Sequence, residues 1–86
     1  MRLYELEPVN SQKSFYGKAQ VCEDGGVRTL FSYGTPVAEI NASGVFTRLW
    51  DDWSATTGKH IKAFCVNEGV EVINKAAWDK MPVARR

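Results

Sequence analysis

The residues best suited to chemistry lie close together, in the run 53–64. Its polar side chains are three hydroxyls, two cations and the only histidine of the chain: Ser54, Thr56, Thr57, Lys59, Lys62 and His60. The first N–H groups of a helix have no partner inside the helix, and the helix dipole makes that end partly positive. A helix that begins here therefore predicts a place for an anion or an acidic partner.

The hydroxyl groups of this run have two interpretations. They can receive a phosphate or carboxylate, or they can do no more than cap the helix, because a side-chain oxygen at a helix start accepts an N–H two or three residues further on. Gly58 lies in the expected first turn, where glycine destabilises a helix by about 1 kcal/mol relative to alanine. A close approach of another backbone or of a ligand would explain the glycine.

His60 suits a general base, an anion contact or a partner contact, and it equally suits a residue that borders the core and hydrogen-bonds locally. A general base needs a nucleophile or an orienting carboxylate within reach, and no spacing in the sequence indicates one. We therefore expect packing at His60 and a protein that is not an enzyme. One histidine and no CxxC spacing predict no metal site, and we expect no cofactor.

Basic and aromatic side chains elsewhere have two interpretations each. Lys59 and Lys62 lie one turn apart on one face of the helix. They predict a basic patch, joined by Arg48 or Lys18, or else a solvated helix face. Three aromatic and two basic residues of the expected strands resemble a stacking surface for single-stranded nucleic acid: Tyr16, Phe31, Tyr33, Lys18 and Arg28. Aromatic residues at strand spacing are, however, more often core.

Two tryptophans flank two carboxylates just before the helix, in the order Trp50, Asp51, Asp52 and Trp53. We expect one tryptophan in the core and the other as a surface anchor, since tryptophan is enriched in binding hot spots. The aspartates indicate a divalent cation only weakly and suit the positive end of the following helix better.

Turn signals at regular spacing predict an antiparallel meander, and Asp24-Gly25-Gly26 between two alternating runs is a strong hairpin signal. The expected strands are 2–7, 14–22, 27–33, 37–40 and 45–50. We expect a helix capped by Ser54 or Thr56 and ended by Gly69, then a short helix capped by Asn74. The expected fold is α+β: a four- or five-stranded antiparallel β-meander with one helix packed on a face and a short C-terminal helix.

The 86 residues predict a single domain, 1–86, with a frayed tail at about 83–86. The formal net charge of +1 indicates no global attraction to nucleic acid or anionic membrane. Cys22 and Cys65 are expected as free, buried thiols, with one strand–helix disulfide as the alternative. No stretch has the ~20 apolar residues of a membrane span. We expect a cytoplasmic protein that does not bind membranes.

Three stretches together resemble a known family: 14–19, 29–40 and the run 53–64. The last contains the pattern Ser-x-Thr-Thr-x-basic-His-Ile-x-x-Phe. Over residues 10–68 the chain resembles a family of small uncharacterised proteins, a domain of unknown function, found in phages and gut-type bacteria. The resemblance implies a small intracellular accessory protein, often phage-encoded, and implies no reaction.

Three functions follow as hypotheses. The first is a non-enzymatic phage or mobile-element protein that binds a host protein or nucleoprotein, most concretely an anti-CRISPR-like inhibitor of a defence nuclease. The second is a nucleic-acid-binding module that uses Lys59, His60, Lys62 and aromatic residues of the sheet. The third is an enzyme with His60 and Thr56 or Thr57 in its site. A homodimer is compatible with exposed strand edges.

The near-neutral charge favours a protein partner. The expected partner-binding residues are the helix start and the end of the preceding hairpin: Tyr33, Thr35, Trp53, Ser54, Thr56, Thr57, Lys59, His60 and Lys62.

Overall fold

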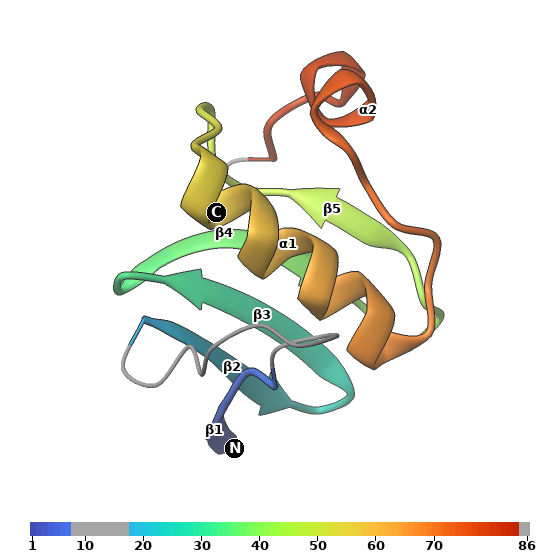
Figure 1. Cartoon of the computed structure of the whole chain (residues 1–86). Coiled ribbons are helices and arrows are strands. Elements are labelled where there is room, and N and C mark those ends of the chain that lie inside the picture. Colours follow the sequence, from blue (N-terminus) through green and yellow to red (C-terminus); the bar gives the residue numbers. More distant parts are fainter. Residues whose placement is uncertain (8–17, 85–86) are drawn as a thin grey trace.

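A five-stranded antiparallel sheet and two helices make up the structure, a computed structural model that describes residues 1–7 and 18–84 (Figure 1). The strands lie side by side in chain order: β1 (Arg2–Glu5), β2 (Ala19–Asp24), β3 (Val27–Ser32), β4 (Thr35–Ile40) and β5 (Phe46–Arg48). Helix α1 (Ala55–Glu68) crosses one face of the sheet, and the short helix α2 (Lys75–Lys80) lies beyond β5. The predicted α+β meander is confirmed.

Two tight turns join the central strands. The β2–β3 turn has Gly25 and Gly26 at φ 60° and 85°, and the β3–β4 turn has Tyr33 and Gly34 at φ 52° and 81°. A two-residue turn with both central residues left-handed is a type I′ turn, whose hand matches the twist of the strands. The hairpin predicted at Asp24-Gly25-Gly26 is therefore confirmed.

The core lies between α1 and the face of the sheet that α1 covers. Alternate residues of each strand point to that face, as Val21 and Leu30 do. The buried apolar residues form one cluster: Leu6, Ala19, Val21, Leu30, Val37, Ala38, Ile40, Ile61, Ala63, Phe64, Cys65 and Trp78. Ile61, Phe64 and Cys65 of α1 belong to this cluster, so the expected packing of one helix on a face of the sheet is confirmed.

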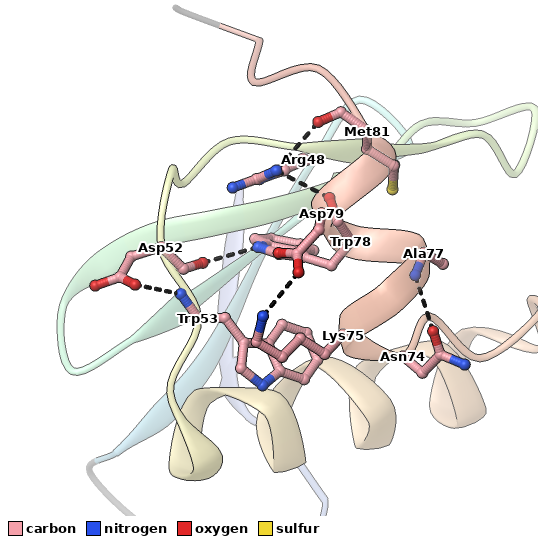
Figure 2. Close-up of polar contacts among 9 residues, drawn as sticks. All are labelled: Arg48, Asp52, Trp53, Asn74, Lys75, Ala77, Trp78, Asp79 and Met81. Carbon is pink, nitrogen blue, oxygen red and sulfur yellow. Dashed lines mark hydrogen bonds and ion pairs between the residues drawn. The ribbon is translucent and has the colours of Figure 1, made fainter.

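Both helices begin and end where local signals place them. The hydroxyl of Ser54 accepts the N–H of Thr57 at 3.0 Å, and Gly69 ends α1 at φ 70°. The side-chain oxygen of Asn74 accepts the N–H of Ala77 at 2.9 Å and caps α2 (Figure 2). The segment 70–73 between the two helices contains no strand.

Several expected bounds differ from the structure. The first and last strands are shorter than the expected 2–7 and 45–50, while β2 extends two residues beyond the expected end at Cys22. The expected strand residues from Ser14 to Gly17 lie outside the described residues, as do Arg85 and Arg86.

Arg48 joins α2 and the C-terminal segment to the sheet (Figure 2). It is only 8% exposed, and its guanidinium donates to the carbonyls of Trp50, Trp78 and Met81 at 2.7, 2.9 and 3.1 Å. The guanidinium also lies 5.0 Å from the ring centre of Trp78. The expected place of Arg48 in a basic surface patch is therefore wrong, because its charged group is used inside the fold.

The same residue also bears on the expected frayed tail. The N–H of Ala84 donates to the carbonyl of Arg48 at 2.8 Å, and Val83 pairs with Arg48 in a parallel bridge. Fraying at 83–86 stays a prediction, and backbone contacts to β5 oppose it at Val83 and Ala84.

Candidate functional site

The expected partner-binding residues divide into an exposed and a buried set. The exposed set is Tyr33, Thr35, Ser54, Thr56, Lys59 and Lys62, and we call it the corner surface. Trp53 is half-buried, whereas Thr57 and His60 are buried, with His60 at 0% exposure. This burial opposes the expectation that Thr57 and His60 contact a partner, because their side of α1 faces β3; the expectation stays a prediction.

The buried set forms a polar cluster with a residue that the sequence did not single out. The hydroxyl of Ser32 lies 2.9 Å from Nδ1 of His60 and 3.0 Å from the hydroxyl of Thr57. Ser32 is the last residue of β3, and the other two belong to the first two turns of α1. The Ser32 cluster, defined by these three residues, therefore ties the start of the helix to the end of the central strand.

His60 is held in its neutral form. Its pKa lies below the ordinary value because burial disfavours the imidazolium and, secondly, because the nearby Lys18 cation repels it. A neutral imidazole has one donor and one acceptor nitrogen, and hydroxyl groups can satisfy either kind by rotating. The interpretation of His60 as a packed, hydrogen-bonded residue is confirmed.

A serine beside a histidine also suggests a nucleophile and its base, so access to the pair decides its chemistry. Ser32 is 3% exposed, and His60 is fully buried beneath the surrounding chain. In this arrangement a substrate atom cannot reach the Ser32 hydroxyl. The hydrogen bond between Ser32 and His60 therefore stabilises the packing of α1 on the sheet.

Tyr33 covers this cluster and is itself exposed. Its ring centre lies 5.8 Å from that of His60, and 58% of its surface is accessible to solvent. The N–H of Tyr33 donates to the carbonyl of Lys18 at 2.7 Å, while its φ of 52° is left-handed. A side chain in this conformation is strained by roughly 1 kcal/mol or more. The turn therefore presents a large aromatic ring at a position where glycine or asparagine would be easier to accommodate.

The close approach expected at Gly58 is made by Trp53. A Cβ atom on Gly58 would lie 2.5 Å from Cζ2 of the Trp53 indole. That indole is held in turn by Trp78, at 5.7 Å between ring centres. Trp50 and Trp53 are both half-buried against the core, and the expectation that one of them is a surface anchor stays a prediction.

The exposed cations are fewer than expected. Lys59 and Lys62 lie on the outer side of α1, and Lys18 is exposed near His60. Arg28 instead points to the helix side of the sheet, where its Nε lies 2.7 Å from Oε1 of Glu68. Phe31 lies three residues further along β3 and points to the opposite face.

Arg28 and Phe31 therefore lie on different faces of the sheet, which opposes the stacking interpretation for these two residues. Tyr16, its other expected member, lies outside the described residues.

The remaining candidate groups are the carboxylates before α1 and the two thiols. Asp52 uses its carboxylate locally, to accept the N–H of Trp53 at 2.7 Å. Across residues 1–7 and 18–84, no three His, Cys, Asp or Glu side chains are placed to hold a metal ion. Cys22 and Cys65 are free thiols; Cys65 is buried and Cys22 is partly exposed. Burial raises the pKa of the Cys65 thiol.

Comparison with known proteins gives one finding. A family model described as a family of unknown function, DUF8033, matches residues 4–80. This match confirms the predicted membership of an uncharacterised domain family. No curated protein and no solved structure matches the chain. No helix in the described part of the chain is long and apolar enough to cross a membrane.

Replacing Gly58 by alanine tests the contact with Trp53. Alanine inside a helix is usually stabilising, but here its methyl group would overlap the indole. We expect Gly58→Ala to lower the free energy of unfolding by about 1–3 kcal/mol in urea denaturation. In a Trp53→Leu background the same change should be neutral or stabilising. An equal loss in both backgrounds would contradict the contact.

Replacing Ser32 by alanine tests the Ser32 cluster. The change leaves buried polar atoms of Thr57 and His60 without their shared partner, which should lower the free energy of unfolding by about 1–3 kcal/mol. The matched control is Ser43→Ala, because the Ser43 side chain is exposed; we expect a change within about 0.5 kcal/mol. Equal effects of the two changes would refute the assigned role.

Proposed function

The chain belongs to DUF8033, a family of unknown function, and we propose that it is a non-enzymatic protein that binds another protein through the corner surface. The observation that carries the proposal is the position of Tyr33. An exposed aromatic ring in a strained turn needs a reason beyond folding, and strained conformations cluster at functional sites. Tyrosine is also among the residues enriched in binding hot spots.

The surroundings of Tyr33 favour recognition over catalysis. The chemistry-bearing residues Ser32, Thr57 and His60 are buried in mutual contact. They hold the β3–β4 turn against α1 and present the Tyr33 ring to solvent. A rigid support lowers the entropy lost when a partner binds.

The corner surface fits an acidic patch on a protein. Lys59 and Lys62 are exposed, and neither is ion-paired within the described part of the chain. Their ammonium groups would steer a partner of opposite charge, and Tyr33 would supply the apolar contact. The overall charge of +1 gives no long-range attraction to a polyanion.

The more specific form of this proposal is a phage or mobile-element protein that acts on a host macromolecule, for example as an anti-CRISPR-like inhibitor of a defence nuclease. It is supported by the resemblance to phage-encoded proteins. Expression in a bacterium that carries an active defence nuclease should then raise the plating efficiency of a targeted phage. No change across the nuclease classes tested would contradict this form and leave the corner surface to be tested separately.

The alternative, a nucleic-acid-binding module, has weaker support. Of the five basic residues considered for this function, three are exposed: Lys18, Lys59 and Lys62. The other two, Arg28 and Arg48, form an ion pair and hydrogen bonds within the fold. Salt dependence distinguishes the two functions, because phosphate contacts release counterions and make affinity fall steeply with salt. A steep fall in affinity for single-stranded DNA or RNA would favour the alternative.

Affinity capture from a lysate of the host bacterium tests the proposed surface. We expect Tyr33→Ala and the double variant Lys59→Glu, Lys62→Glu each to reduce recovery of the specific partner about tenfold or more, as hot-spot residues do. The matched control is Lys75→Glu, Lys80→Glu, which makes the same charge change on exposed positions of α2.

All variants are first compared with the wild type by circular dichroism, so that loss of fold is separated from loss of binding. Undiminished recovery by both corner-surface variants would refute the proposed surface. An equal loss in the α2 control would show that net charge, and not the corner surface, governs binding.

A further inference from the structure

Lys18 lies directly beside Tyr33, at the open end of the β2–β3 hairpin. The two strands pair as far as Ala19 and Ser32, and the next hydrogen bond runs from the N–H of Tyr33 to the carbonyl of Lys18 at 2.7 Å. This bond fixes the backbone of Lys18 relative to the β3–β4 turn. The turn that presents the Tyr33 ring to solvent therefore also sets the position of the lysine.

The side chains of Lys18 and Tyr33 lie around the same buried ring. The ring centre of Tyr33 is 5.8 Å from that of His60. Burial lowers the pKa of His60, and the ammonium group of Lys18 is close enough to lower this pKa further. His60 is fully buried, whereas Lys18 and Tyr33 are exposed. An exposed cation and an exposed aromatic ring therefore share one part of the surface, next to the corner surface on α1.

The ammonium group of Lys18 has no anionic partner within the described part of the chain. Ion pairs between described residues join Arg28 to Glu68 and Lys75 to Asp79, and neither involves Lys18. The imidazole below it is neutral and supplies no negative charge. A carboxylate from another molecule would therefore gain a charge-assisted hydrogen bond at this position without displacing one from the chain.

We propose that Lys18 and Tyr33 together bind an acidic side chain of the protein partner, a proposal that rests on the corner surface being the binding site. The ammonium group of Lys18 donates to the carboxylate, and the ring of Tyr33 packs against the methylene groups of the same side chain. Lys18 thereby becomes a further partner-binding residue, and a glutamate or aspartate becomes the group that it recognises.

The residues present favour a carboxylate over a phosphate. Arginine forks bind phosphate in a bidentate way, whereas a lysine acts as a compact point charge. Arg28 and Arg48 form their contacts within the fold and are not offered to a ligand. One lysine beside one aromatic ring matches the single charge and the apolar stem of an acidic side chain.

Lys18 differs in role from Lys59 and Lys62. Those two lysines lie on the outer side of α1 and are exposed. Charges at the rim of an interface mainly change the rate of association, whereas a hydrogen-bonded charge pair that the partner covers changes the rate of dissociation. Lys59 and Lys62 therefore attract the partner, and Lys18 holds one of its side chains against the Tyr33 ring.

An NMR titration with an acidic peptide tests this contact. The probe is a peptide of alternating glutamate and alanine, and its control has glutamine in place of glutamate. We expect the glutamate peptide to shift the amide signals of Lys18 and Tyr33, and the glutamine peptide to leave them unchanged. Lys18→Met keeps the backbone carbonyl and the bulk of the side chain. It should raise the dissociation constant of the glutamate peptide about threefold to fivefold, the loss expected for one ion pair at a surface.

The matched variant is Lys80→Met, which removes one charge from an exposed position of α2 and should leave the dissociation constant nearly unchanged. Equal effects of the two variants would overturn the proposal. So would the absence of a shift up to about 10 mM peptide, where a complex with a dissociation constant of about 1 mM would be almost fully formed. Inorganic phosphate or a short oligonucleotide that shifts both signals as strongly as the glutamate peptide would also overturn it.

The titration does not use a captured partner, so its failure and that of the corner surface are observed separately. If Tyr33→Ala lowers partner recovery while Lys18→Met changes neither recovery nor peptide binding, the role of Lys18 is refuted and the corner surface stands. A loss of recovery with Lys18→Met, of the size found with Tyr33→Ala, together with weaker peptide binding, would support the proposal.

Discussion

The hydrogen bonds of the Ser32 hydroxyl hold the start of α1 on the sheet. Ser32 and its partners lie where water does not reach, so leaving any of them unpaired would be unfavourable by about 1–3 kcal/mol per group. Apolar contacts alone allow a helix to shift along a sheet, whereas a paired buried cluster is satisfied in one position. The register of α1 against β3 follows from this cluster.

Two features near the cluster depend on that register. The Trp53 indole occupies the space that the missing side chain of Gly58 leaves, and Trp78 holds it there. Tyr33, next to Ser32 in the chain, rests its ring on His60 and exposes the rest to solvent. Thr57 and His60, which suggest chemistry in the sequence, thus support the fold from inside. The corner surface is formed by residues next to them, such as Tyr33.

Local signals predicted most of the fold. Ser54, Gly69 and Asn74 act on backbone groups within a few residues of themselves, and the left-handed φ angles of the β2–β3 turn suit the glycines at positions 25 and 26. The expected close approach at Gly58 was also correct, although its source is a side chain of the chain itself and neither a backbone nor a ligand.

Long-range pairs could not be predicted in this way. Ser32 and His60 are 28 positions apart, and only the packing of α1 across β3 brings them together. The alternation of β3 puts Ser32 on the same face as Leu30, which is the one signal that could have indicated burial. Arg48 was expected to be exposed and is buried. An arginine in a strand usually points to solvent, yet here three carbonyl oxygens accept hydrogen bonds from its guanidinium.

The central claim is that His60 is a neutral, buried support of the Tyr33 turn, and ring ¹⁵N NMR of His60 tests it most directly. Because burial and the Lys18 cation lower its pKa, the imidazole should stay neutral, in one tautomer, as the pH falls from 8 through its ordinary value of about 6.5. The amide signal of Tyr33 should stay constant over the same range. A ring that titrates near 6.5 while the protein remains folded would contradict the account. It would show that solvent reaches His60, and the interpretations of His60 as a general base or a partner contact would then be favoured.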